Sequence, residues 1–559
     1  MAEIAAETTD TAEKKPASLK TVVAASSAGT AFEWYDFFVF GSLTQVISKT
    51  FFSGLPEAAG YIAALALFGA GFLFRPLGAL VFGRIGDKAG RKGAFLVTVA
   101  LMGGATFAIG LLPTYAQVGL LAPALLVLMR IVQGFALGGE YGGAAIYVAE
   151  HAPPGGRGRA TSWVQTSAAL GLFGALMVIL ATRLILGKFF GPDAFDAWGW
   201  RVPFLFSAGL LAISIWMRLK LSESPAFTKM KAEGTSSKAP FAEAFGQWPN
   251  LKIVLLALIA IMSAQGAVWY TAFFYTQTFM ERFLKVPPET INLLMLSATA
   301  ASAIGYVAFG WMSDRFGRKP VMLFGMTLML VAYFPGFHLL SQTLNPALAE
   351  AEVRTPVVVV ADPADCSLQF DPVGKAAFVS SCDIAKSSLA NAGVSYRTEA
   401  GPAGAPAVVR MGEASVPSTS AAGLPADAGK AAKAAVETRI KAALVEAGYP
   451  PKADPERMNL WGAFGVLLVF VIAATALYGP IAACLVELFP TRIRYTAMSL
   501  PYHIGTGWIG GFVPFTAFAI VAATGNIYSG LWYPFAFTAI SVLTCFFLLP
   551  ETKGRSLDN

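Results

Sequence analysis

Long apolar segments separated by short polar loops make up most of this chain. A window of about 19 residues finds such segments near residues 21–48, 58–82, 94–113, 119–149, 161–186 and 202–219, and again near 252–280, 289–312, 320–341, 460–486, 497–523 and 528–549. Each segment is long enough to cross about 30 Å of hydrocarbon as an α-helix. The pattern therefore predicts an all-α polytopic membrane protein with twelve transmembrane helices, six in each half.

The composition agrees with a membrane protein and excludes a soluble enzyme. Of the 559 residues, 55% are hydrophobic and 13% are charged, whereas about 25% are charged in an ordinary soluble domain. The formal net charge of +7 does not indicate nucleic-acid binding, because the basic residues stand in short loops between apolar segments. We expect the lipid bilayer as a partner and no nucleic acid.

The positions of lysine and arginine predict how the chain is oriented in the bilayer. If the N-terminus is inside, most basic residues fall in inner loops, including a loop at 218–238 that begins with Arg218. The positive-inside rule then predicts that both termini are cytoplasmic. Residues 1–20 lack an apolar core followed by a cleavage site, so no signal peptide is expected. We expect a multi-pass protein of a plasma membrane of the bacterial inner-membrane type.

One loop sequence occurs once in each half. GRIGDKAGRK at residues 83–92 recurs as GWMSDRFGRK at residues 310–319, both times between the second and third spans of its half. The glycines allow a tight turn, and the acid and bases can pair across a mobile interface and so latch one conformation. For a single copy, the alternative is that the charges only enforce topology. The predicted latch consists of Gly83, Asp87, Gly90, Arg91, Lys92, Asp314, Arg315, Gly317 and Arg318.

An extra segment interrupts the second half between the ninth and tenth spans. Residues 342–459 are rich in Ala, Pro, Ser, Asp and Lys, and by parity they lie outside. A strand-like run at 355–361 and an amphipathic stretch at 431–447 predict a small extracytoplasmic α/β-like insertion. Residues 399–428 are equally typical of a loose linker.

The two cysteines of the insertion, Cys366 and Cys382, predict a disulfide in an extracytoplasmic compartment, with free thiols as the alternative.

These patterns divide the whole chain into successive parts. We expect a cytoplasmic tail at 1–20, an N-terminal six-helix bundle at 21–219 and a cytoplasmic central loop at 220–251. A C-terminal bundle at 252–341 and 460–549 follows, which is split by the insertion at 342–459, and the chain ends with a cytoplasmic tail at 550–559.

Several motifs resemble those of one transporter superfamily. The duplicated loop, RIVQG at 130–134 and PETKG at 550–554 are similar to the signature of the major facilitator superfamily. Within it, the chain resembles the metabolite:H⁺ symporter family, whose members carry osmolytes, dicarboxylates, citrate or shikimate. The resemblance implies two six-helix bundles that rock about a central site. Its specific marks are FEWYDFF at 32–38, FRPLG at 74–78, GGEYGGA at 138–144, WRVPF at 200–204 and ESP at 223–225.

Ionisable residues at membrane depth are costly and tend to face a cavity or a partner, and here they are concentrated in the first half. Asp36 is the leading candidate for the proton carrier, because an acid beside Arg75 or Arg130 can exchange a bound proton for a salt bridge as substrate arrives. The alternative is a permanent structural ion pair. Glu33 lies three residues earlier on nearly the same helix face and is the other candidate carrier.

Substrate-binding candidates come from both halves. Arg130, followed by Gln133, fits an anion ligand or a coupling group, a role that the resemblance also implies. Arg75 can bind a carboxylate, or it can cap the helix carbonyls freed by Pro76. Glu140 stands between glycine pairs of the fourth span, where we expect a structural role in helix packing.

Three candidates lie in the second half. Gln265 and Tyr270 of the seventh span line the substrate path unless the aromatic residues there form an interfacial belt. His503 in the eleventh span can titrate near physiological pH, or it is a hydrogen-bonded side chain with no further role.

No motif indicates catalysis, a cofactor or a metal site. We therefore expect proton-coupled uptake of a small polar metabolite, with that metabolite and protons as the partners of a monomeric chain. Two arginines at membrane depth favour an organic acid, but they mark the whole family and so leave a zwitterionic osmolyte such as betaine open. A nutrient receptor with a transporter fold and a separate binding function of the insertion are also compatible with these patterns.

Overall fold

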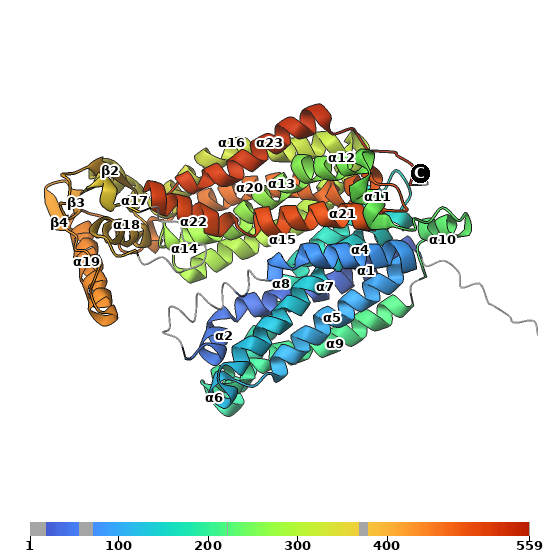
Figure 1. Cartoon of the computed structure of the whole chain (residues 1–559), viewed down its shortest axis with the longest axis horizontal. Helices are drawn as coiled ribbons and strands as arrows, with labels where there is room; N and C mark the ends of the chain where they lie inside the picture. Colours follow the sequence, from blue (N-terminus) through green and yellow to red (C-terminus); the bar gives the residue numbers. More distant parts are fainter. Residues whose placement is uncertain (1–17, 55–66, 68–70, 221, 368–377, 558–559) are drawn as a thin grey trace, which may run out of the picture.

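Long helices run side by side through most of the molecule, and a small α/β unit lies beyond one end of them (Figure 1). The computed structural model describes residues 18–54, 67, 71–220, 222–367 and 378–557. In this part of the chain, ten helices or continuous helical series are long and apolar enough to cross a membrane. The first expected span is present as a long helix, and the second lies partly outside the described residues.

The first half of the chain builds one group of helices. Its members are α1 (Leu19–Ser42), α2 (Thr44–Phe51), α4 (Arg75–Ala89), α5 (Arg91–Leu111), α6 (Tyr115–Val118), α7 (Leu121–His151), α8 (Arg157–Phe190) and α9 (Arg201–Leu219), with a π-helical turn at Phe195–Gly199. α1 packs against α8 and α9, while α5 packs against α7 and α9. Two short helices, α10 (Pro225–Ala232) and α11 (Pro240–Gly246), follow in the central loop.

The second half builds the other group. Its members are α12 (Trp248–Ala257), α13 (Ser263–Tyr270), α14 (Thr276–Arg282), α15 (Pro288–Phe316), α16 (Arg318–Leu344), α20 (Leu460–Leu488), α21 (Arg494–His503), α22 (Val513–Thr524) and α23 (Trp532–Leu548), with π-helical segments at Leu258–Met262, Thr271–Tyr275 and Ile504–Gly510 and a 3₁₀ turn at Ser529–Leu531. α16 and α15 pack against α20. The two groups meet where α8 contacts α15 and where α4 contacts α21.

The seventh and eleventh spans approach each other very closely. A Cβ atom placed on Gly266 would lie 2.1 Å from the carbonyl oxygen of Gly505, so only glycine fits there. Each span also contains a π-helical segment beside this contact, a distortion that is frequent at functional sites. Tyr270 ends α13 and His503 ends α21, so both side chains start from this distorted region.

The segment between α16 and α20 folds into a small α/β unit. Its elements are α17 (Pro346–Arg354), β1 (Val357–Ala361), α18 (Ser381–Ala392), β2 (Tyr396–Ala400), β3 (Val408–Met411), β4 (Ala414–Pro417) and α19 (Ala426–Glu446), with 3₁₀ turns at Pro363–Asp365 and Pro455–Arg457. The strand order is β2-β1-β3-β4, in which β1 and β2 are parallel and the other pairs antiparallel. Because β3 and β4 form a hairpin, the loose-linker alternative for 399–428 is wrong for these strands.

The core of the insertion is built from alternate residues of its strands. Val357, Val359 and Ala361 of β1 are buried, as the period of two along a strand predicts. Cys366, just after β1, forms a disulfide with Cys382 in the first turn of α18. This bond ties the end of the central strand to the start of the helix that crosses to β2.

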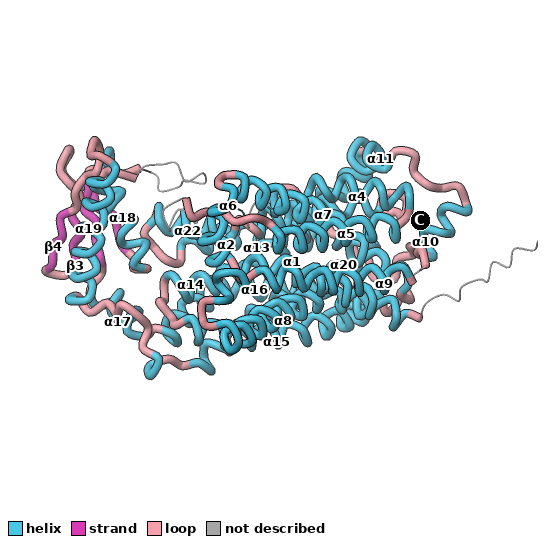
Figure 2. The backbone as a smooth tube through the Cα atoms, turned by 90° about the horizontal axis from the view of Figure 1, so that it is seen from below, coloured by secondary structure: helices cyan, strands magenta, loops and turns pink. Residues whose placement is uncertain are grey.

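The insertion is attached to the ends of the second-half helices. The backbone N–H of Tyr396 donates to the carbonyl of Gly525 over 2.6 Å, and the Nζ of Lys285 donates to the carbonyl of Asn391 over 2.9 Å. Figure 2 shows α18 and α19 at one end of the molecule, and α10, α11 and the C-terminus at the other. We call these the insertion end and the latch end.

Candidate functional site

The first copy of the latch joins the two halves at the latch end. Asp87 forms an ion pair of 2.5 Å with Arg91 of its own half. Its carboxylate also accepts the backbone N–H groups of Tyr495 and Thr496, over 3.2 and 2.8 Å, in the first turn of α21. A carboxylate at a helix N-terminus is stabilised by the helix dipole, so this acid of the first half holds a helix of the second half.

The second copy reproduces the arrangement with the halves exchanged. Asp314 lies 2.6 Å from Arg318, and its two oxygens accept the backbone N–H groups of Gly158 and Arg159, each over 2.8 Å, at the start of α8. Each half therefore supplies one acid that caps a helix of the other half.

Two buried glutamates complete this ion network. Glu487 pairs with Arg318 at 3.1 Å and with Arg157 at 3.5 Å. In the mirrored position, Glu150 pairs with Arg494 at 2.7 Å and lies 4.0 Å from Arg91. Both glutamates thus connect residues of the two halves, and the latch end is closed by charges in this structure.

The glycines and remaining bases of the latch have distinct places. A Cβ on Gly83 would lie 2.8 Å from the Cα of Thr496, which explains the close approach of α4 to α21. Gly90 and Gly317 adopt φ of +120° and +107° at the breaks between helices, where a side chain would be strained. Lys92 and Arg315 take no part in the ion pairs among the described residues. The Nζ of Lys92 donates to a backbone carbonyl, and the guanidinium of Arg315 lies over a tryptophan ring.

Sequence reasoning missed two helix caps of the latch. The carboxylate of Glu223 accepts the backbone N–H groups of Arg91 and Lys92, and Glu551 does the same for Arg318 and Lys319. The ESP and PETKG motifs contained the signal, because each places one acid shortly after the last span of its half.

Asp36 lies at one end of a short chain of hydrogen bonds in the first half. It is buried, and its neighbour is the Thr106 hydroxyl. That hydroxyl accepts the side-chain amide of Gln133 over 2.8 Å, and the Gln133 oxygen accepts Nη1 of Arg130 over 2.7 Å. Asp36 forms no ion pair with any residue that the structure describes, and only Thr106 and Gln133 connect it to Arg130. We call Asp36, Thr106, Gln133 and Arg130 the polar relay.

Aromatic rings hold the two buried arginines of the first half. The guanidinium carbon of Arg75 lies 4.1 Å from the ring centre of Phe72 and 5.1 Å from that of Phe37. The guanidinium carbon of Arg130 lies 5.8 Å from the same Phe37 ring and 4.1 Å from Phe40. Such cation–π contacts stabilise a guanidinium without neutralising it. Within the described residues Arg75 has no carboxylate partner, and its Nε and Nη2 atoms form no hydrogen bond.

The second half faces these arginines with aromatic side chains. The Tyr270 ring lies 6.0 Å from that of Phe72, which places Tyr270 beside Arg75. Across the same interface, the rings of Tyr141 and Tyr502 stack at 3.6 Å with an interplanar angle of 9°. Tyr270 is buried, so the interfacial-belt alternative is wrong for this residue.

The other second-half candidates are buried close by. Tyr502 shares a hydrogen bond of 2.6 Å with Tyr478, and the Trp269 indole donates to Tyr306 over 2.8 Å. His503 packs edge-on against Tyr502 with ring centres 5.0 Å apart. Gln265 is buried, and its Oε1 atom has no hydrogen-bond partner among the residues that the structure describes.

Glu33 and Glu140 are joined by Arg218, a residue that the sequence places at the start of an inner loop. Arg218 is fully buried at the end of α9, and its Nη2 lies 2.7 Å from Glu33 and 3.1 Å from Glu140. The reading of Arg218 as an inner-loop charge is wrong, because the last turn of α9 carries it back into the helix group. Glu140 is thus ion-paired. Asp36 and Glu33 are three residues apart on α1, but Glu33 pairs with Arg218 whereas Asp36 lies beside Thr106.

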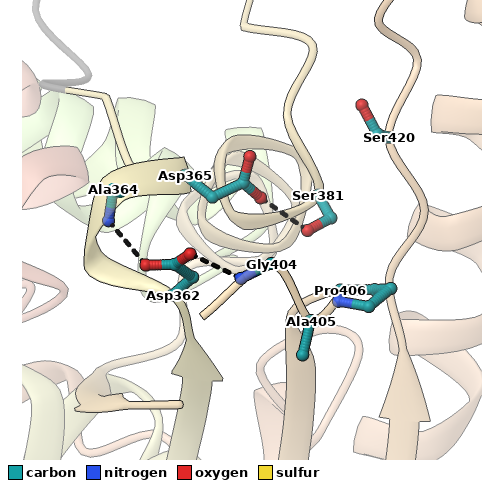
Figure 3. A pocket seen from close by; sticks show the side chains of 8 residues that line it. All are labelled: Asp362, Ala364, Asp365, Ser381, Gly404, Ala405, Pro406 and Ser420. Carbon is teal, nitrogen blue, oxygen red and sulfur yellow. Dashed lines mark hydrogen bonds between the residues drawn. The ribbon is translucent and has the colours of Figure 1, made fainter. Parts of the chain in front are cut away.

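A separate cavity lies in the insertion. It has a volume of about 370 Å³, and its lining includes Asp362 and Asp365 after β1 and Ser381 at the start of α18 (Figure 3). The backbone N–H groups of Gly404 and Ala364 bind the Asp362 carboxylate and lower its pKa. Asp365 accepts the Ser381 hydroxyl over 2.7 Å. Among the described residues, no group of three or more His, Cys, Asp or Glu side chains that could hold a metal ion occurs.

Known families match most of the chain outside the insertion. Residues 21–249 and 449–559 match the family described as "Sugar (and other) transporter", and residues 269–349 match "Major Facilitator Superfamily". A solved structure of the proton:xylose symporter XylE superposes with a TM-score of 0.60 at 14% identity, covering 97% of this chain and 98% of that one. The fold is therefore that of a major facilitator transporter.

Similar proteins with known names indicate which family within the superfamily this chain belongs to. The chain is 35% identical to a proline/betaine transporter of Salmonella typhimurium over 337 residues, 58% of this chain and 66% of that protein. It is 36% identical to the shikimate transporter of Escherichia coli over 56% of this chain and 70% of that protein. It is 34% identical to the citrate-proton symporter of Klebsiella pneumoniae over 56% of this chain and 69% of that protein. The chain belongs to the metabolite:H⁺ symporter family of the major facilitator superfamily, as its motifs predict.

Proposed function

We propose that this protein imports a small organic acid together with protons by alternating access. The observation that carries the proposal is the environment of Arg75, a buried guanidinium that has no carboxylate partner among the described residues. A buried charge without a counter-ion is costly, and a substrate carboxylate that binds between the two halves would supply the missing charge. The contact of Phe72 with Tyr270 supports a site at the interface of the halves.

In this proposal Asp36 carries the proton. An ionised carboxylate in its buried position would lack a counter-charge, which favours a bound proton. When the proton leaves, the negative charge of Asp36 acts through Thr106 and Gln133 on Arg130, which weakens the binding of a second anion beside that guanidinium. Release of the proton therefore promotes release of the substrate, and the polar relay couples the two events. Glu33 remains the other candidate for the carrier.

In this proposal, the latch controls whether the latch end of the transporter is open or closed. Asp87 and Asp314 each cap a helix of the opposite half, so opening the latch end requires both caps to be withdrawn. Residues 21–219 would then rock as one body against residues 252–341 and 460–549. We propose that the latch end and both termini are cytoplasmic and that the insertion is extracytoplasmic, which agrees with the basic loops and with the disulfide.

A specific observation supports one alternative, a zwitterionic osmolyte such as betaine. Trp269, Tyr270, Tyr141, Tyr502 and Tyr478 gather at the interface of the halves, and aromatic faces bind quaternary ammonium groups. The relatives include a protein named as a proline/betaine transporter. An osmolyte with both a carboxylate and an ammonium group would use Arg75 and this aromatic cluster together.

Substrate-induced proton movement in proteoliposomes tests the proposal. The panel contains dicarboxylates, monocarboxylates, shikimate-like acids and betaines, with a pH-sensitive dye outside. We expect external alkalinisation with one class of organic acid. Alkalinisation with betaines alone would replace the organic acid by an osmolyte. A silent panel, combined with ligand-induced thermal stabilisation, would overturn symport in favour of a receptor.

A further inference from the structure

A second charged cluster lies in the first half, apart from the polar relay and the latch. Glu33 of α1, Glu140 of α7 and Arg218 of α9 form this triad. One guanidinium nitrogen, Nη2, contacts both carboxylates, at 2.7 and 3.1 Å. The second oxygen of each glutamate has no hydrogen-bond partner among the described residues, nor do Nε and Nη1 of Arg218. The triad is therefore connected through a single atom.

The packing around the triad excludes water and other counter-ions. The exposed fractions of Glu33, Glu140 and Arg218 are 3%, 2% and 1%. The Arg218 guanidinium lies 3.7 Å from the ring centre of Phe95 on α5. It also passes so close to α1 that a Cβ on Gly29 would lie 2.4 Å from Nη2. The four helices α1, α5, α7 and α9 thus enclose the charges.

The charges of the triad do not balance if both glutamates are ionised. Two carboxylates and one guanidinium carry a net negative charge, which is costly in a water-free site. Among the residues that the structure describes, Tyr495 of α21 is a further titratable neighbour, and its hydroxyl donates to the Gly139 carbonyl. Asp87 and Arg91, beyond that tyrosine, already pair with each other. A proton bound by either glutamate restores the balance, because one carboxylate and one guanidinium then remain.

We propose that Glu33 and Glu140 share one exchangeable proton across Arg218, so that this triad is a second proton-binding site of the first half. The proposal rests on the proton coupling proposed above, and it gives Arg218 the role of a positioning residue. Glu33 lies one helical turn from Asp36 on α1, so the two sites lie in series along that helix.

The position of Glu140 connects the triad to the latch. Glu140 follows Gly139, which accepts the Tyr495 hydroxyl, and the backbone N–H of Tyr495 donates to Asp87. When the latch opens, α21 withdraws Tyr495 and water gains access to Glu140. The triad can then release its proton to the latch end, while the closed latch keeps that proton in place.

Infrared difference spectroscopy of the purified protein in lipid, recorded between acidic and alkaline pH without substrate, tests this proposal. Protonated carboxyl groups are detected by their C=O stretch and its shift in heavy water. We expect Glu33→Gln and Glu140→Gln to lose the same carboxyl band, and Asp36→Asn to keep that band. Each glutamine variant retains one carboxylate to pair with Arg218, so both should fold.

Arg218→Lys keeps the positive charge but changes the geometry, so we expect its carboxyl band to shift rather than vanish. If all carboxyl bands persist unchanged in both Glu33→Gln and Glu140→Gln, the shared proton does not exist. If only one of the two variants loses a band, the proton belongs to that residue alone, and sharing is overturned. The spectra are recorded without substrate, so they are independent of the transport panel. A silent panel contradicts symport and leaves the carboxyl bands unchanged. Conversely, observed symport does not show that the two glutamates share a proton.

Discussion

The interiors of the two halves differ sharply, although their latches are alike. The first half buries Glu33, Asp36, Arg75, Arg130, Glu140 and Arg218. Among the described helices of the second half, the buried Asp, Glu, Lys and Arg residues all belong to the latch network, and tyrosines and tryptophan face the interface instead. Closing the latch end requires equal contributions from both halves, whereas proton and anion binding require charges in only one. In the proposed mechanism, the first half therefore binds the proton and the anion, and the second half supplies the aromatic surface that moves against it.

Removing the acid of the polar relay should have the largest effect. We expect Asp36→Asn to lose proton-driven accumulation, because the proton site is gone, while it retains exchange of substrate across the membrane. Accumulation and counterflow of labelled substrate in proteoliposomes measure the two activities. Full accumulation by this variant would eliminate Asp36 as the carrier and leave Glu33.

Removing the positive charge at the interface should mainly weaken binding. Loss of a buried charge pair costs about 2 kcal/mol or more, so we expect Arg75→Gln to lower the affinity for an organic acid roughly 30-fold or more. Arg75→Lys is the matched control, which keeps the charge and should lose less. An unchanged KM in Arg75→Gln would remove the carboxylate-binding role.

The two copies of the latch should respond alike. Asp87→Asn and Asp314→Asn each weaken a helix cap and an ion pair, at a cost of about 1–2 kcal/mol, which favours opening of the latch end. The labelling rate of a cysteine placed at Ser499 reports that opening, with Arg84→Gln as an exposed control. A large effect from one aspartate and none from the other would contradict the symmetry.

The aromatic wall should tune binding without changing coupling. Tyr270→Phe keeps the ring and removes the hydroxyl that interacts with Arg75, so we expect a change in KM of roughly 2- to 10-fold. The number of protons moved per substrate should stay the same. A changed proton stoichiometry would mean that the second half takes part in proton transfer.

The smallest expected effect concerns the stability of the insertion. Burial raises the pKa of Glu352 in α17 above its usual value, opposed by a hydrogen bond from Ser395. The folded form thus holds a proton more tightly than the unfolded form, so this contribution to stability is present at low pH and is lost as pH rises through the raised pKa. Thermal unfolding at several pH values should show this slope, and Glu352→Gln should flatten it. If the pH dependence of thermal unfolding persists in Glu352→Gln, another titratable group causes it.

The sequence predicts the helical spans and the latch well because both rest on local patterns. Apolar length defines a span, and the two similar loops indicate that their acids and arginines occupy equivalent places in the two halves. The strand at 357–361 and most of α19 also follow from local periodicity. The latch partners in the opposite half, such as Tyr495 for Asp87, have no signal in the spacing of the motif itself.

The surroundings of the buried charges were not predictable in the same way. Arg218 stands at the end of a span, where a basic residue is typical of a loop, and only the packing of α9 against α1 shows that it pairs with Glu33. The stack of Tyr141 on Tyr502 joins residues of different halves. Such partners depend on how the helices pack within one half and on how the two halves meet, which hydrophobic patterns do not encode.

Accumulation against an imposed pH gradient tests the central claim most directly. The substrate is the acid that gives alkalinisation, and its steady-state ratio across the proteoliposome membrane is measured with and without a protonophore, in the wild-type protein and in Asp36→Asn. We expect a ratio in the wild type that follows the pH gradient and collapses with the protonophore, and simple equilibration in Asp36→Asn. A wild-type ratio that ignores the pH gradient, or a variant that accumulates fully, would contradict proton coupling through the first half.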